Sequence, residues 1–227
     1  MPNLDHDWTQ AATALDSQGW ALLPGLLSPD ECHDTASLYD TGHFRSQVIM
    51  ARHGFGRGAY QYFAYPLPPL VQQLRTALYP PLAGIANAWH ARMGMARRFP
   101  ETHEGWLGEC HAAGQTRPTP LLLRYGPGDY NCLHQDLYGD HVFPLQAAVL
   151  LDRDFTGGEL VLTEQRPRMQ SRVSVVPLAE GDAVVFAVNQ RPVAGSRGDY
   201  RVTMRHGVSP LRSGKRHVLG IIFHDAS

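Results

Sequence analysis

The spacing of apolar residues changes along this chain near Pro120. Before that point, several segments repeat apolar side chains every three or four residues, which is the period of an amphipathic helix. The pattern predicts helices over residues 7–18 and 28–39. Two proline-led segments predict a helix over residues 67–79 and a separate one over residues 80–95, because a proline usually restarts or ends a helix.

After Pro120 the apolar residues lie in short continuous or alternating runs, separated by glycine and proline turns. This pattern is typical of antiparallel strands. The predicted strands cover residues 121–125, 130–134, 143–151, 159–163, 173–177, 183–188, 200–208 and 216–224. Strands at this regular spacing favour a closed or double-sheet antiparallel fold, and a jelly roll protects its strand edges. The order of elements therefore predicts an α+β class, with N-terminal helices packed against one sheet of a jelly roll.

Between the two patterns, residues 43–65 mix arginines, glycines and aromatic residues. Glycines permit unusual backbone angles, aromatic rings can stack on a planar ligand, and arginines can meet phosphates. Such a segment can serve as a lid over a substrate, and the alternative is a surface hairpin that covers the sheet. Residues 97–118 are polar and irregular, so His103 and His111 are expected to be ordinary surface or loop histidines.

A length of 227 residues favours one compact domain, with residues 1–118 as a helical and lid region and residues 119–227 as the strand-rich core. No apolar run reaches the roughly 18–20 residues of a membrane span, and the N-terminus lacks a signal-peptide pattern, so we expect a cytoplasmic protein without a membrane partner. The three cysteines, Cys32, Cys110 and Cys132, are scattered and lack C-x-x-C spacing, which favours reduced thiols.

Charge adds a local feature to this picture. The formal net charge is -1, but the segment from Arg166 to His217 holds ten basic residues against three acidic ones. An arginine-rich face can bind the phosphates of a nucleic acid, and a solvated surface rich in arginine is the alternative.

The residues with the clearest chemical meaning are His134 and Asp136. Residues two apart in a strand point to the same face, so the imidazole and the carboxylate can approach one point. A second histidine, His206, ends a later predicted strand, and Arg216 opens the next one. Two histidines and one carboxylate with open positions form the facial triad of non-haem Fe(II) oxygenases.

The order His134-x-Asp136, His206 and, ten residues later, Arg216 resembles the signature of the Fe(II)- and 2-oxoglutarate-dependent dioxygenases. The segment from His206 to Arg216 is similar to the closing motif of prolyl-4-hydroxylase-like members. The resemblance covers about Pro120 to Asp225 and implies a double-stranded β-helix, the jelly roll of this superfamily. It also implies that residues 119–227 are the catalytic core.

The resemblance implies roles for five residues. His134, Asp136 and His206 would hold Fe(II) and act as the catalytic centre, Arg216 would bind the distal carboxylate of the cosubstrate 2-oxoglutarate, and Tyr125 would contact the same cosubstrate through its hydroxyl. With O2, the reaction would hydroxylate a C–H bond and release succinate and carbon dioxide.

Two resemblances bear on the substrate. The segment from Arg124 to Gly128, with Leu133 to Asp136, is similar to the AlkB-type nucleic-acid demethylases, and Gly157 to Ser171 resembles a bacterial family labelled as oxygenases acting on damaged nucleic acid. They imply oxidative demethylation or repair of alkylated DNA or RNA.

Two positions depart from the AlkB-type motif, which has an asparagine where this chain has Leu123 and a second arginine where it has Ile222. The Arg216 spacing is that of the prolyl hydroxylases, so protein or amino-acid hydroxylation is the second interpretation. A non-catalytic metal-binding jelly roll is the third, and it would have no need of Arg216.

Overall fold

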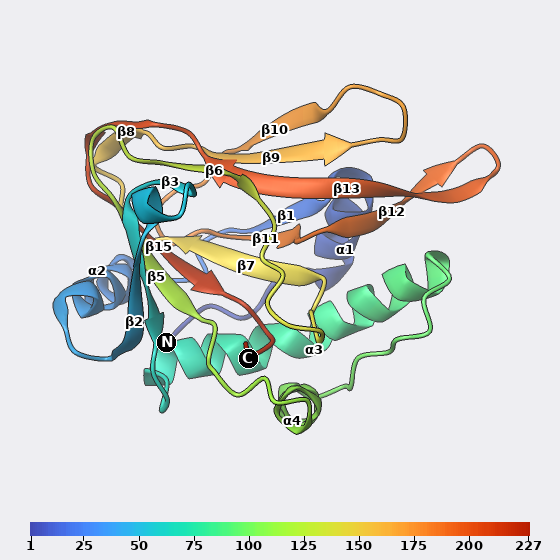
Figure 1. Cartoon of the computed structure of the whole chain (residues 1–227), viewed down its shortest axis with the longest axis horizontal. Helices are drawn as coiled ribbons and strands as arrows, with labels where there is room; N and C mark the ends of the chain where they lie inside the picture. The colour runs from blue at the N-terminus through green and yellow to red at the C-terminus, as the bar shows by residue number, and fades with distance from the viewer.

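The strands of the protein form two antiparallel sheets that face each other (Figure 1). The computed structural model describes all residues from Met1 to Ser227. The strands are Trp20–Leu23 (β1), Phe44–Ile49 (β2), Gly56–Arg57 (β3), Ala59–Phe63 (β4), Leu121–Tyr125 (β5), Tyr130–His134 (β6), Leu145–Leu150 (β7), Phe155–Gly157 (β8), Leu160–Gln165 (β9), Arg172–Val176 (β10), Ala183–Ala187 (β11), Gln190–Gly195 (β12), Gly198–Val208 (β13), Leu211–Gly214 (β14) and Arg216–Ile221 (β15).

The larger sheet has seven strands in the order β1-β11-β7-β15-β5-β4-β2. The smaller sheet has the order β10-β9-β13-β6-β3, with β12 paired to β13, and β14 pairs with β8 in a short separate ribbon. We call the two main sheets the major and the minor sheet. All their strand pairs are antiparallel, and the strand order crosses repeatedly between distant parts of the chain. The predicted jelly roll, or double-stranded β-helix, is confirmed.

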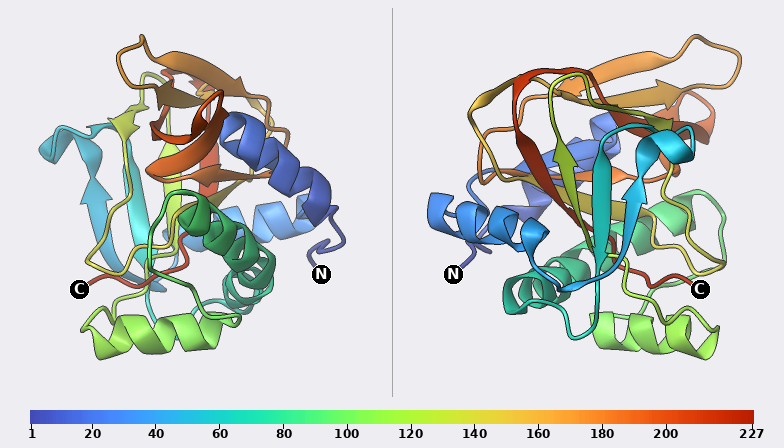
Figure 2. Two further views of the ribbon diagram at one scale, coloured as in Figure 1. Left: turned by 90° about the vertical axis from the view of Figure 1, so that its right-hand side faces the viewer. Right: turned by 60° about the vertical axis from the view of Figure 1, so that its left-hand side comes forward.

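The helices lie mainly on the side of the major sheet (Figure 1). They are Trp8–Gln18 (α1), Pro29–Ser37 (α2), Pro69–Arg92 (α3) and His103–Ala112 (α4), with 3-10 turns at Leu38–Asp40 (η1) and Met50–Arg52 (η2). In the minor sheet, α1 and α3 contact β12. Figure 2 shows α3 and α4 on one side of the molecule and β9 and β10 on the opposite side. None of these helices is long and apolar enough to cross a membrane.

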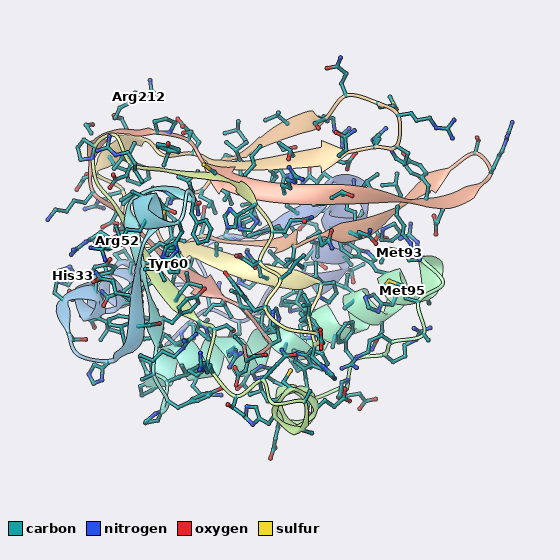
Figure 3. All side chains as sticks on the ribbon, in the orientation of Figure 1. His33, Arg52, Tyr60, Met93, Met95 and Arg212 are labelled. Atoms are coloured by element: carbon teal, nitrogen blue, oxygen red, sulfur yellow. The ribbon has the colours of Figure 1, made fainter.

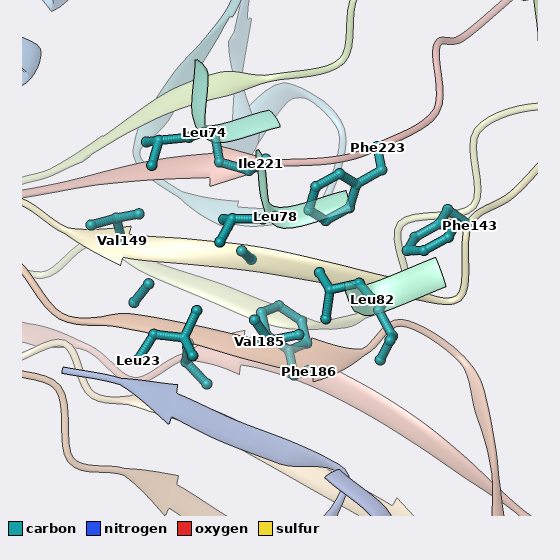
Figure 4. Packing of buried hydrophobic residues seen from close by; sticks show 14 of the residues in the cluster. Leu23, Leu74, Leu78, Leu82, Phe143, Val149, Val185, Phe186, Ile221 and Phe223 are labelled. Atoms are coloured by element: carbon teal, nitrogen blue, oxygen red, sulfur yellow. The ribbon is translucent and has the colours of Figure 1, made fainter. Parts of the chain in front are cut away.

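Two helix predictions were wrong. The chain does not restart at Pro80 and Pro81, because α3 runs unbroken through both prolines. Its Leu74, Leu78 and Leu82 are buried in the main core beside the strands of the major sheet (Figure 4), and this packing outweighs the missing amide donors.

The segment expected to be irregular contains α4. The Thr102 side chain caps this helix by accepting a hydrogen bond from the Gly105 amide. His103 is buried on α4, with its Nε2 2.9 Å from the Phe223 carbonyl, so the prediction of a surface histidine is wrong for this residue. His111 is partly exposed, and its Nε2 lies 2.8 Å from a carboxylate oxygen of the buried Asp225.

Residues 43–65 extend the sheets at their edges instead of covering a face. Strands β2 and β4 pair with each other, and β4 pairs with β5 at the edge of the major sheet. The intervening β3 pairs with β6 of the minor sheet. The first 118 residues thus supply strands to both sheets through β1, β2, β3 and β4, and the division of the chain at residue 118 stays a prediction.

A buried ion pair fixes the C-terminal segment to α3. Arg75 and Asp225 are both fully buried, and a guanidinium nitrogen of Arg75 lies 2.7 Å from a carboxylate oxygen of Asp225. Arg75 also donates hydrogen bonds to the carbonyls of Ile222 and His224. Because every partner is satisfied, the charges are tolerated in the core, and the chain after β15 is held against the helix.

We expect acid to destabilise the protein through two buried histidines. Burial, aided by the nearby Arg75 charge, lowers the pKa of His103 and of His224 to about 4. The unfolded chain binds protons near pH 6.5, so stability is full above pH 6.5 and falls as the pH drops toward 4. Each of the two histidines should lower the free energy of unfolding by on the order of 2 kcal/mol between pH 6.5 and pH 4.

Urea unfolding at several pH values measures this loss. In His103→Gln, the fall in unfolding free energy between pH 6.5 and 4 should be smaller than in the wild type. A variant of the exposed His33 is the matched control and should keep the wild-type slope. Equal slopes in all three proteins would contradict the assignment.

Candidate active site

The pairing of β6 with β13 places two histidines opposite each other in the minor sheet. His134 and His206 are direct cross-strand partners, and the next partners are Asn131 and Val208. Between these pairs β6 has one more residue than β13, which is a β-bulge. The two imidazole rings lie with their centroids 4.1 Å apart.

Gly207 allows the two strands to approach at the bulge. A Cβ atom at this position would lie 2.7 Å from the backbone oxygen of Asn131, closer than real Cβ atoms come. A larger residue would therefore push β6 and β13 apart between the two histidines. The sequence pattern did not single out Gly207, because the need for a glycine arises only from the pairing of distant strands.

Asp136 completes the cluster just after the end of β6. Its Oδ1 lies 3.5 Å from Nε2 of His134, and its Oδ2 lies 3.2 Å from Nε2 of His206. One ligand atom from each of the three residues lies within 4.8 Å of the others, so together they could hold a metal ion. The structure thus brings together the three residues predicted to form the metal site.

Hydrogen bonds from neighbouring residues orient His134 and Asp136. Nδ1 of His134 lies 2.7 Å from the Cys132 carbonyl, which can only accept, so Nδ1 carries the proton and Nε2 is left with a lone pair. The Tyr138 hydroxyl donates to Oδ1 of Asp136 at 2.8 Å, and the Gln146 amide donates to Oδ2 at 2.9 Å. Gln146 is the polar residue within the otherwise apolar strand β7, and that exception was the signal for it in the sequence.

The protonation of the cluster follows from its burial and its mutual contacts. Burial alone would raise the pKa of Asp136, but the hydrogen bond from His134 and the proximity of His206 hold it well below its usual value. Burial would lower the pKa of His134, yet its contacts with Asp136 raise it. Burial dominates for His206, and its pKa is lowered.

Arg216 and Tyr125 are also cross-strand partners, at the start of β15 and the end of β5 in the major sheet. Both residues are buried, with 3% and 1% of their surface exposed. The Nε and Nη1 atoms of Arg216 and the hydroxyl of Tyr125 are buried without a hydrogen-bond partner. Burial raises the pKa of Tyr125 to about 12, so the phenol keeps its proton at neutral pH.

One cavity of about 320 Å³ joins these groups. It is lined by the three clustered residues, by Arg216 and Tyr125, and by apolar side chains from both sheets, including Leu123, Phe186 and Ile222. All five site residues predicted from the sequence therefore line one cavity. Tyr138 contacts Asp136 directly, and Arg124 pairs with Asp40 and does not line the cavity.

Several solved structures share this fold. A prolyl-4-hydroxylase from Pseudomonas putida aligns with 97% of this chain and 100% of its own, with a TM-score of 0.54 and 16% identity. A prolyl hydroxylase from Trichoplax adhaerens, in complex with a hypoxia inducible factor peptide, covers 96% of this chain and 89% of its own, with a TM-score of 0.62 and 14% identity. A 2OG-Fe(II) oxygenase family oxidoreductase from Burkholderia pseudomallei covers 100% and 95%, with a TM-score of 0.53 and 16% identity. At these identities the likeness shows a common fold.

Comparisons of sequence identify relatives and a family. "Uncharacterized protein Rv2227" of Mycobacterium tuberculosis (strain ATCC 25618 / H37Rv) is 49% identical over 174 residues, which are 75% of this chain and 75% of that protein. "Uncharacterized protein MT2286" of strain CDC 1551 / Oshkosh matches to the same extent. Residues 58–226 match the model of the Oxygenase-NA family, described as "Oxygenase, catalysing oxidative methylation of damaged DNA". This match covers β4 to β15 and every residue that lines the cavity except Gly54 and Phe55. The chain therefore belongs to the Oxygenase-NA family of oxygenases.

Proposed function

We propose that this protein is an Fe(II)- and 2-oxoglutarate-dependent dioxygenase that hydroxylates a C–H bond of alkylated nucleic acid and so removes an N-methyl group as formaldehyde. The observation that carries the proposal is the unpartnered guanidinium of Arg216, buried in the same cavity as His134, Asp136 and His206. A buried cation without an anionic partner is costly. A carboxylate ligand in the cavity would supply that partner.

The donor set fits Fe(II). Two imidazole nitrogens and a carboxylate oxygen form a facial triad, and the rest of the cavity leaves room for further ligands. His134 presents Nε2 because its Nδ1 donates to the Cys132 carbonyl, and this outer hydrogen bond fixes the ring for binding a metal ion.

The other end of the cavity fits 2-oxoglutarate. Arg216 offers a planar guanidinium that can bind the distal carboxylate through two parallel hydrogen bonds, and the Tyr125 hydroxyl is a further free donor. The rings of Tyr125 and Phe155 lie 5.7 and 5.9 Å from the guanidinium carbon and confine it. Neither donor has a protein partner to lose when the cosubstrate binds.

Bound Fe(II) and 2-oxoglutarate would together activate O2 for hydroxylation of a C–H bond, with release of succinate and carbon dioxide. The chain's own residues prepare this site. Tyr138 and Gln146 hold the Asp136 carboxylate in place, and Phe186 packs against the His206 ring at a centroid distance of 4.8 Å. Leu123, Val218 and Ile222 line the cavity with apolar surface and limit the entry of water.

The family description and the arginine-rich C-terminal third support nucleic acid as the substrate class. A second candidate is protein or amino-acid hydroxylation of the prolyl type. It is favoured by Leu123 and Ile222, which line the cavity at the two positions where the AlkB-type motif has polar residues. A non-catalytic metal-binding module would leave the buried Arg216 without a purpose.

Product analysis tests the proposal. The purified protein, Fe(II), 2-oxoglutarate and ascorbate should release succinate, and methylated oligonucleotides should increase this release and yield formaldehyde in equal amount. A hydroxylated peptide with a mass gain of about 16 Da, without formaldehyde, would favour the second candidate. Absence of succinate under every condition would reject the dioxygenase.

Tyr138→Phe should weaken metal binding while the fold is kept. The substitution removes the hydroxyl that donates to Oδ1 of Asp136, so the carboxylate loses one of its two orienting contacts. We expect metal affinity to fall about tenfold, the lower end of the effect of losing such an outer contact. Calorimetric titration with Co(II) measures the change, and Tyr130→Phe, a more exposed tyrosine outside the cavity lining, is the control. Equal affinities for the wild type and Tyr138→Phe would contradict this role.

A further inference from the structure

The minor sheet has an outer face that no helix covers. Strand alternation buries His206 on the cavity side of β13 and exposes Arg205 on the opposite side. The cross-strand partner of Arg205 is Thr163 of β9, and the partner of Thr163 on the next strand is Val173 of β10. Val173 and Val175 are 59% and 57% exposed. Figures 1 and 2 show α4 and most of α3 on the other side of the molecule, and only the C-terminal end of α3 reaches β13, where Arg92 pairs with Asp199.

This outer face is positively charged. Arg168 at the tip of the β9–β10 hairpin, Arg197 at the tip of the β12–β13 hairpin and Arg205 on β13 are all exposed. None of the three has a carboxylate oxygen within ion-pair distance, in contrast to Arg166 and Arg172, which pair with the buried Glu164. Free guanidinium groups beside exposed valines offer both phosphate contacts and apolar contact to bases.

The same sheet leads to the cavity mouth. Its next strand, β6, carries Leu133, which lines the cavity and is 47% exposed. Phe55, also 47% exposed and also lining the cavity, lies on the segment that joins η2 to β3, and its carbonyl accepts a hydrogen bond from the amide of Cys132 in β6. Three strand spacings of about 4.8 Å separate β10 from β6, so a ligand crosses roughly 14 Å of sheet to reach the mouth.

We propose that the outer face of the minor sheet, together with the tips of the β9–β10 and β12–β13 hairpins, binds the backbone of a single-stranded nucleic acid next to its target base. The inference rests on the proposed function, because it assigns the substrate of the same site. Asp136 and His206 are only 8% and 7% exposed, so a base must leave its stack to reach them. A single strand avoids the cost of unpairing.

Two double variants test the surface. Arg197→Gln with Arg205→Gln removes two charges from the outer face, and Arg117→Gln with Arg153→Gln removes two exposed charges elsewhere. Fluorescence anisotropy with a labelled single-stranded oligonucleotide gives Kd over a range of salt concentrations. The outer-face variant should bind at least about tenfold more weakly at low salt, and its plot of log affinity against log salt should flatten by about 1.4. The control variant should bind like the wild type.

Val175→Glu provides an independent variant, because it adds a negative charge at an exposed position on the same face without removing an arginine. It should weaken binding, and its melting temperature shows whether the fold is kept. Equal losses in the outer-face and control variants would overturn the proposal, as would tighter binding of duplex than of single strand. Substrate-free succinate release by the wild type reports separately on the proposed function, so failure of the surface and failure of the dioxygenase are distinguishable.

Discussion

Asp136→Ala is expected to abolish metal binding and all Fe(II)-dependent release of succinate. Asp136 is the anionic member of the cluster, and without it two neutral imidazoles would have to hold a divalent cation alone. The substitution also leaves the Tyr138 hydroxyl and the Gln146 amide without their acceptor. We expect metal affinity to fall by at least about 1000-fold, a loss of roughly 4 kcal/mol.

Calorimetry with Co(II) and an assay for succinate measure the two effects. Asp140→Ala is the matched control, since Asp140 is an exposed aspartate in the same loop, four residues later. Melting curves in the presence of a chelator show whether the variant folds. Retention of metal-dependent turnover by a folded Asp136→Ala protein would reject the proposed metal site.

Arg216→Met should raise the KM for 2-oxoglutarate by about 100-fold or more. Removing one member of a buried, hydrogen-bonded charge pair costs about 2–5 kcal/mol, and methionine keeps the apolar stem that packs at this position. Metal binding should change little, because Arg216 belongs to β15 of the major sheet and the three clustered residues lie on or next to β6 and β13 of the minor sheet.

Steady-state assays over a range of 2-oxoglutarate concentrations separate KM from kcat. Arg212→Met, four residues earlier and largely exposed on β14, is the control. Arg216→Lys should give an intermediate KM, since lysine keeps the charge and loses the planar pair of donors. If the KM of Arg216→Met for 2-oxoglutarate stays within twofold of the wild type, the cosubstrate does not bind at this end of the cavity.

The strands near the site could be predicted from the sequence, because apolar runs and turn residues are patterns of neighbouring residues. Strands β5 and β6 begin and end where alternation and the turn after Tyr125 predict. The approach of His134, at the end of β6, to Asp136, two residues later, was also expected from the two-residue period of a strand. Their meeting with His206 could be inferred only from the order of motifs, because the pairing of β6 with β13 joins residues about seventy positions apart.

Other features depend on packing that a local pattern does not contain. The prolines of α3 predict a break, and burial of the helix against the major sheet overrides them. The role of Gln146 depends on β7 facing Asp136 across the cavity, and the role of Gly207 depends on the bulge opposite it. Helix α4 did have a local signal, the Thr102 cap with buried residues at His103, Trp106 and Cys110.

The bulge in β6 sets a limit on how this protein can vary in length. The extra residue between Asn131 and His134 brings His134 opposite His206, and in a strand a shift of one residue turns every following side chain to the other face. Loss or gain of one residue there would turn the imidazole to the solvent side, even though the sheet could still form. The tips of the β9–β10 and β12–β13 hairpins carry no such constraint. Natural relatives should therefore differ in length at these hairpin tips and keep the same number of residues between the positions of Asn131 and Asp136.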